Sequence, residues 1–125
     1  MKHTILLVED ELGIRETVKI FLKSQNYEVI EAENGKEGLI ALQNNDIHLA
    51  IVDIMMPVMD GIAATKAIRA MDDRPDAKTI PIIAMTANAF EEDAKRCLAA
   101  GMTAHLAKPF QIEDVEKTIV ECCGK

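Results

Sequence analysis

The sequence has few basic residues and no long apolar segment. Lys and Arg number 14 against 21 Asp and Glu in 125 residues, so the formal net charge is −7. Nucleic acids and anionic membranes both require a basic face, so we expect no nucleic acid and no membrane among the direct partners. In addition, no apolar run approaches the roughly 20 residues of a membrane-spanning helix.

The start of the chain and its cysteines argue against secretion. The opening MKHTILLVEDE has a short apolar run closed by acidic residues, whereas a signal peptide needs a longer apolar region and a cleavage site. The cysteines Cys97, Cys122 and Cys123 are odd in number and form no C-x-x-C pair. We expect ordinary thiols in a reducing compartment and a soluble cytoplasmic protein; a redox or metal role for Cys122 and Cys123 is the alternative.

Short β-branched segments alternate with segments of helical periodicity along the whole chain. The former predict five strands, at Thr4–Val8, Glu28–Ala32, His48–Asp53, Ile80–Met85 and Ala104–Ala107. Apolar residues at three- and four-residue steps predict five helices, at Leu12–Gln25, Lys36–Gln43, Ile62–Met71, Phe90–Ala100 and Ile112–Cys123. This alternation favours one α/β domain over residues 1–125, a doubly wound parallel sheet with helices on both faces.

Polar residues gather at the carboxyl ends of the predicted strands. Glu9 and Asp10 follow the first strand, Asp53 ends the third, and Thr86 and Lys108 follow the fourth and fifth. In open α/β sheets the functional crevice lies at these ends, and the common strand order 2-1-3-4-5 would bring all of them together. Clustered carboxylates repel one another and need a cation. Mg²⁺ suits a site with one or two direct carboxylates and several waters.

A metal, a lysine and a hydroxyl together suit the stabilisation of a phosphoryl group. The sequence has no Gly-rich phosphate loop, no catalytic Ser/His/Asp set and no H-E-x-x-H motif. Asp53 is then the place where the phosphoryl group attaches, because a carboxylate can act as nucleophile and form an acyl phosphate. For Glu9 and Asp10 the alternative is that they cap the following helix.

Segments along the chain, namely LLVEDE, VDIMMPVMDG, IIAMTANA and HLAKPF, resemble the receiver domain of bacterial two-component response regulators. The resemblance covers essentially the whole chain and implies a flavodoxin-like fold of strand order 2-1-3-4-5. The segment AMTANAF and the longer loop before it are most similar to receivers of hybrid sensor kinases.

The resemblance also implies a Mg²⁺ site. Asp10 matches the direct metal ligand, and Glu9 matches the acid that acts on the metal through water. Asp53 contributes to the same site. Met55 matches the position whose backbone carbonyl binds the metal.

For the phosphoryl group, the resemblance implies that Asp53 is the phosphoacceptor, that the Thr86 hydroxyl switches onto the phosphoryl oxygens and that Lys108 pairs with them. Pro109 matches a proline that follows a cis peptide. His105 departs from the family, which has Tyr or Phe at this position and uses that aromatic ring in the switch.

We therefore expect a phosphorylation-switched signalling module, not a turnover enzyme. A histidine kinase or histidine phosphotransfer protein would donate the phosphoryl group, and the face formed by the fourth helix, fifth strand and fifth helix would contact a downstream protein. Candidate residues on or near this face are Phe90, Glu91, His105, Gln111 and Glu116. Only Gly124 and Lys125 follow the last predicted helix. We therefore expect either that the chain has no output domain and acts by protein contact, or that it is a piece of a larger protein.

Two alternatives remain. A Mg²⁺-dependent aspartyl-phosphate phosphatase of the haloacid dehalogenase kind needs a second acid two residues after its nucleophile, and that position is Met55. A degenerate receiver that binds partners without phosphorylation is expected to have lost Asp53, Lys108 or the acidic pair, and all are present.

Overall fold

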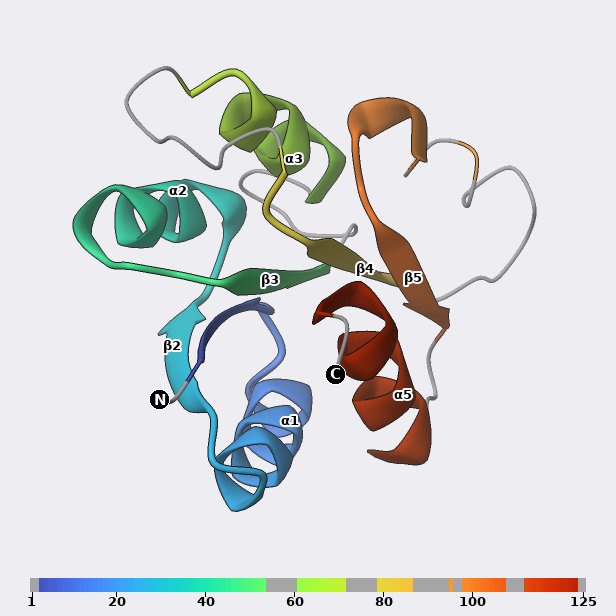
Figure 1. Cartoon of the computed structure of the whole chain (residues 1–125). Helices are drawn as coiled ribbons and strands as arrows, with labels where there is room; N and C mark the ends of the chain where they lie inside the picture. Colours follow the sequence, from blue (N-terminus) through green and yellow to red (C-terminus); the bar gives the residue numbers. More distant parts are fainter. Residues whose placement is uncertain are drawn as a thin grey trace.

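The β-branched segments form one parallel sheet in the computed structural model, which describes residues 3–53, 61–71, 79–86, 95, 98–107 and 112–123. The strand order is β2-β1-β3-β4-β5, as predicted (Figure 1). The strands are β1 (Thr4–Val8), β2 (Glu28–Ala32), β3 (Leu49–Asp53), β4 (Ile82–Thr86) and β5 (Ala104–Ala107).

Helices cover both faces of the sheet, with α2 and α3 on one face and α1 and α5 on the other (Figure 1). The helices are α1 (Leu12–Ser24), α2 (Gly35–Asn44), α3 (Gly61–Arg69) and α5 (Ile112–Cys123). The helix predicted at Phe90–Ala100 lies mostly outside the described residues, although Lys95 and residues 98–100 have helical backbone. Within the described part of the chain, no helix has the length and apolar character needed to cross a membrane.

Two strands begin later than the sequence predicts. The strand expected from Ile80 begins at Ile82, because Pro81 has no N–H for the ladder and contributes only its carbonyl, which accepts from the Ala50 N–H at 2.9 Å. The strand expected from His48 begins at Leu49. Here the Thr4 N–H donates to His48 Nδ1 at 2.9 Å, so regular pairing between β1 and β3 starts at Ile5 and Leu49.

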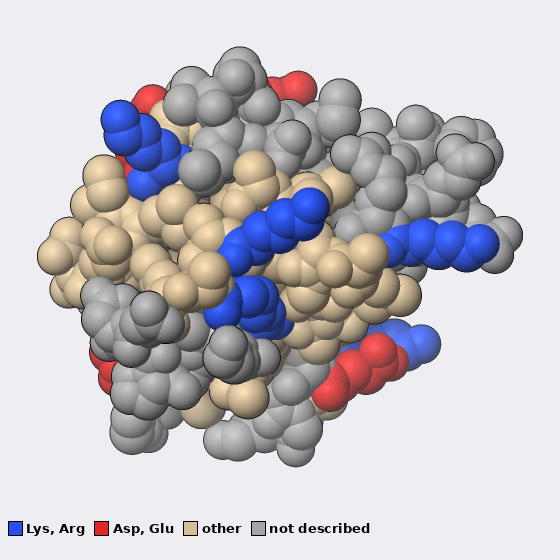
Figure 2. Space-filling view, turned by 90° about the horizontal axis from the view of Figure 1, so that it is seen from above, with Lys and Arg blue, Asp and Glu red and all other residues tan. Residues whose placement is uncertain are grey.

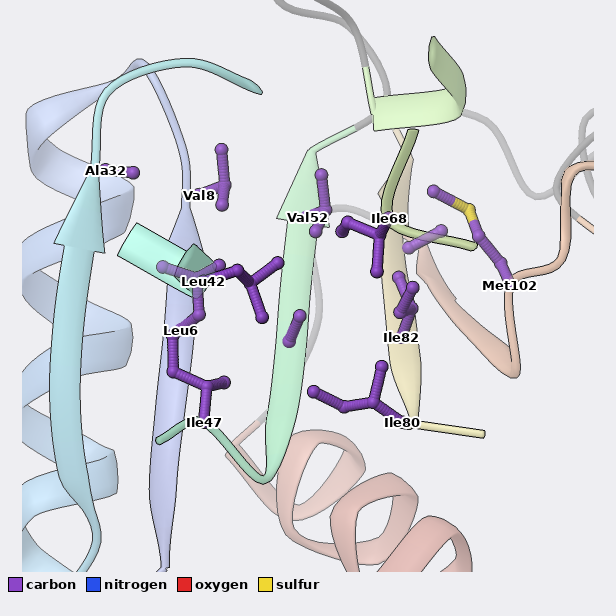
Figure 3. Packing of buried hydrophobic residues seen from close by; sticks show 12 residues of the cluster. Leu6, Val8, Ala32, Leu42, Ile47, Val52, Ile68, Ile80, Ile82 and Met102 are labelled. Atoms are coloured by element: carbon purple, nitrogen blue, oxygen red, sulfur yellow. The ribbon is translucent and has the colours of Figure 1, made fainter. Parts of the chain in front are cut away.

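Aliphatic side chains on both faces of the sheet make up the core. On the face of α2 and α3, Leu42 and Ile68 pack over residues of β1, β3 and β4 (Figure 3). On the opposite face, Val18 and Leu22 of α1 and Ile119 of α5 pack against the same strands. Burial on both faces explains why these strands are apolar throughout and do not alternate.

A half-buried arginine joins α3 to the segments that precede β4 and β5. Arg69 donates to the Gly101 carbonyl from Nε at 3.0 Å and from Nη2 at 2.7 Å, and Nη1 donates to the Ile80 carbonyl at 2.8 Å. Desolvation by burial lowers the pKa of Arg69. Gly101, at φ +104°, adopts a backbone conformation that favours glycine.

Helix α2 approaches β1 closely at Gly38, and this contact yields a stability prediction. A Cβ at Gly38 would lie 2.9 Å from Cγ2 of Val8, a buried and β-branched side chain with little freedom to move. Overpacking costs about 1–3 kcal/mol, against a gain of about 1 kcal/mol in helix propensity. We expect Gly38→Ala to lower the free energy of unfolding by about 1 kcal/mol in urea titrations.

Gly13 in α1 is the matched control. A Cβ there meets nothing within 4 Å, so Gly13→Ala should raise the free energy of unfolding. The prediction fails if both substitutions change stability in the same direction.

Candidate functional site

Three carboxylates converge where β1 and β3 end. One oxygen from each of Glu9, Asp10 and Asp53 lies within 4.8 Å of the other two. The register explains this, since Val8 of β1 lies opposite Val52 of β3 and the acids follow directly at the same edge of the sheet. Asp53 is 3% exposed and Glu9 is 0% exposed, whereas Asp10 is exposed.

This arrangement fits a hard divalent cation. Like charges at this separation in a partly dry site repel strongly, and a cation between them offsets that repulsion. The donors are all oxygen, which Mg²⁺ and Ca²⁺ prefer, whereas zinc and copper sites favour nitrogen and sulfur. The exposed Asp10 lets a hydrated ion approach from solvent.

Glu9 is anchored by its backbone and its carboxylate. Its N–H donates to the Ala32 carbonyl at 3.1 Å, which extends the pairing of β1 with β2. Its Oε2 accepts from the Glu11 N–H at 3.1 Å, at the N-terminus of α1, where the side chain of the N-cap residue Glu11 makes no capping hydrogen bond. The helix-capping interpretation of Glu9 is therefore partly right, and it coexists with membership of the carboxylate cluster.

Arg15, a buried residue of α1, is not among the residues predicted from the sequence. Its Nη1 donates to the Glu9 carbonyl at 2.8 Å, and its Nε donates to Oε1 of Glu31 in β2 at 3.1 Å. Arg15, Val18 and Leu22 follow one another at steps of three and four residues, which places a cation on the apolar face of the helix. This pattern in the sequence could have identified Arg15 as a residue with a specific buried partner.

A lysine one turn further along α1 completes this network. Lys19 Nζ donates at 3.2 Å both to Glu31 Oε2 and to Glu16 Oε1. The hydrogen bonds that Lys19 donates to Glu16 and to Glu31 raise its pKa. Each oxygen of Glu31 therefore has a cationic donor from α1.

For the other predicted site residues, the structure describes the backbone of Thr86 and of His105 only. Thr86 ends β4 and pairs with Ala107, one position beyond the pair formed by Asp53 and Met85, so the backbones of β3, β4 and β5 end at one edge. The Thr86 and His105 side chains lie outside the described residues. The same is true of Met55, Lys108 and Pro109, and β5 ends at Ala107, directly before Lys108 in the sequence.

The sequence and the fold have known counterparts. A model of the response regulator receiver domain matches residues 5–120. The chain is 33% identical to the chemotaxis protein CheY4 of Vibrio cholerae, with a TM-score of 0.91 over 98% of this chain and 99% of that chain. It is also 33% identical to the receiver domain of the sensor histidine kinase PA1611 of Pseudomonas aeruginosa, with a TM-score of 0.89 over all of both chains; in that structure a magnesium ion is coordinated in the active-site cleft.

Among curated proteins, the chain is 35% identical to the sensor histidine kinase RcsC of Escherichia coli over 92% of its own length. It spans 12% of the length of RcsC and between 13% and 46% of the length of three other curated relatives.

The chain belongs to the response regulator receiver domain family. It is a receiver domain of two-component signalling systems, and its resemblance to the receivers of sensor kinases is confirmed.

The electrostatics of the cluster yield a prediction for Asp53→Asn. In EDTA, this substitution removes one of the mutually repelling charges and should raise the melting temperature by several °C, since about 1 kcal/mol corresponds to about 4 °C in a domain of this size. Mg²⁺ should stabilise the wild type by mass action and stabilise the variant much less.

Scanning fluorimetry with EDTA and with Mg²⁺ measures both effects. Glu116→Gln, at an exposed position of α5, is the control for the change in net charge and should behave as the wild type does. A lower melting temperature for Asp53→Asn in EDTA would contradict the proposed repulsion.

Proposed function

We propose that Asp53 accepts a phosphoryl group from a histidine kinase or a histidine phosphotransfer protein. The observation that carries this proposal is the convergence of Asp53 with Glu9 and Asp10 at one edge of the sheet. In this proposal residues 1–125 act as one receiver domain, of which the family model spans 5–120.

The position of β3 supports Asp53 as the nucleophile. The strand lies between β1, which leads to the acidic pair, and β4, which ends in Thr86. A phosphoryl group on Asp53 would thus have the acidic side of the site on one flank and the end of β4, at Thr86, on the other. Glu9 is less suited, because one of its oxygens already accepts from the Glu11 N–H.

The transfer is a nucleophilic displacement at phosphorus. An Asp53 carboxylate oxygen forms a bond to phosphorus while the bond from phosphorus to the donor breaks, and the donor leaves with that electron pair. The Lys108 ammonium and the Thr86 hydroxyl stabilise the phosphoryl oxygens by charge and by hydrogen bonding. The domain catalyses only its own phosphorylation and slow dephosphorylation.

The acidic side of the site holds Mg²⁺ in this proposal. Asp10, Asp53 and the Met55 backbone carbonyl are direct ligands, and Glu9 acts through water. The ion, when bound, neutralises charge on the carboxylates and on the phosphoryl oxygens. The magnesium ion in the receiver of PA1611 supports this assignment.

The signal then passes by protein contact. Phosphorylation biases a pre-existing equilibrium between two conformations, with Thr86 as the switch residue and the face formed by the fourth helix, β5 and α5 as the contact surface. On the face of the molecule seen in Figure 2, the described Lys and Arg side chains are interrupted by uncharged surface. The net charge of −7 favours a protein partner over nucleic acid or an anionic membrane, and in this proposal the contact is made in the cytoplasm.

Phosphorylation by a small donor tests the central assignment. We expect acetyl phosphate with Mg²⁺ to add one phosphoryl group to the wild type, measured by intact mass, and none in EDTA. Asp53→Asn should stay unmodified, because an amide is not a competent nucleophile. Equal modification of the wild type and the variant would overturn the assignment of Asp53.

The two acids of the pair should differ in their effect on Mg²⁺ binding. Asp10 is exposed and able to meet a hydrated ion directly, whereas Glu9 is buried and holds the Glu11 N–H. We expect Asp10→Asn to weaken Mg²⁺ binding by about tenfold or more and Glu9→Gln to weaken it less. Amide chemical shifts followed by NMR during a Mg²⁺ titration give both affinities, and the reverse order would contradict the assigned roles.

A further inference from the structure

We propose that Arg15 is a positioning residue for Mg²⁺ binding, which it promotes by clamping the peptide between Glu9 and Asp10. This inference rests on the proposed function of the acidic cluster. It concerns a residue that contributes no ligand atom and carries the wrong charge for a metal ligand.

The contact that carries the inference is the hydrogen bond from Arg15 Nη1 to the Glu9 carbonyl, which is 2.8 Å long and buried. That carbonyl belongs to the peptide unit whose nitrogen is the amide of Asp10. Holding the carbonyl fixes the plane of this unit, and with it the positions of the Asp10 N and Cα atoms from which the side chain extends. The Glu9 N–H also donates to the Ala32 carbonyl, and Glu9 Oε2 accepts from the Glu11 N–H. Together with the bond from Arg15, these contacts fix the end of β1 at three points.

The guanidinium is itself held in place. Glu31 Oε1 accepts from Arg15 Nε at 3.1 Å, and Glu31 lies opposite Leu7 in the register, on the sheet face that α1 covers. The planar fork of arginine allows Nε and Nη1 to engage two different acceptors at once, which a lysine ammonium on a flexible stem does less well.

Helix stability does not account for Arg15. It lies in the first turn of α1, where a cation interacts unfavourably with the helix dipole, and its burial removes water from the guanidinium. The hydrogen bonds to the Glu9 carbonyl and to Glu31 offset these costs, and both acceptors lie outside the helix. The guanidinium therefore serves the junction of β1 with α1.

Removing Arg15 has two opposing effects on Mg²⁺ affinity, and their signs separate the possible roles. Loss of a nearby positive charge would by itself make the site more attractive to a cation. Loss of the clamp would leave Asp10 less well oriented and weaken binding, as happens when groups that orient metal ligands are removed. A decrease in affinity thus identifies positioning, since the charge alone predicts an increase.

The test compares Arg15→Met with Lys19→Met in the same chain. Both substitutions remove one positive charge from α1 and disturb a contact with Glu31, but the hydrogen bonds of Lys19 are made to Glu16 and Glu31, whereas Arg15 also donates to the Glu9 carbonyl. We expect Arg15→Met to weaken Mg²⁺ binding by about tenfold in NMR titrations, and Lys19→Met to leave it unchanged within about twofold. Melting temperatures in EDTA measure the loss of stability separately.

Arg15→Lys is the second variant and retains the positive charge. If Arg15→Met does not fold, the Mg²⁺ affinity of Arg15→Lys tests whether Arg15 is a positioning residue. Weaker Mg²⁺ binding by this variant supports positioning, and wild-type affinity in a folded Arg15→Met or Arg15→Lys protein overturns it. Tighter binding by Arg15→Met also overturns it. If the wild type binds Mg²⁺ and the Arg15 variants bind it as tightly or more tightly, the inference about Arg15 fails and the proposed function stands. A wild type that binds no Mg²⁺ overturns both.

Discussion

The electrostatic cost of the carboxylate cluster is the constraint on which the arrangement of this domain depends. Bringing Glu9, Asp10 and Asp53 within 4.8 Å of one another, with two of them buried, is unfavourable without a cation. The rest of the fold opposes this repulsion through the pairing of β1 with β3 and through the apolar layers on both faces of the sheet. Cation binding is thereby coupled to a scaffold that is already formed.

Strand register sets the geometry of the site as much as residue type does. Because side chains alternate between the two faces of a sheet, a slip of one residue between β1 and β3 would turn Asp53 away from Glu9. The buried aliphatic residues oppose such a slip, since Ile51 and Val52 lie in the cores on opposite faces. The apolar residues that precede Asp53 in β3 therefore fix where its carboxylate lies. As the last residue of the strand, Asp53 is the one acid in β3 and lies at the edge of the sheet where the cluster forms.

Most of the sheet could be predicted from the sequence because its signals are local. The β-branched segments identified the strands, and polar residues at their ends identified Glu9, Asp10 and Asp53 as one cluster. Boundaries set by single residues were less predictable, as at Pro81, whose missing N–H moves the start of β4 to Ile82. Arg15 was missed because its role arises from acceptors in β1 and β2 that only the folded chain brings to α1.

The network that holds the side of the site formed by β1 and β2 bears on how phosphorylation is transmitted. On the side of β1 and β2, hydrogen bonds from Arg15 and Lys19 join α1 to the strands, and each acceptor is fixed by a specific donor. A switch requires one part that stays in place and another with two accessible arrangements. In the proposed function, the network of α1 keeps the metal ligands in place while Thr86, at the end of β4, responds to the phosphoryl group. Asp53 lies on the strand between these two sides, so a charge added there acts on both at once.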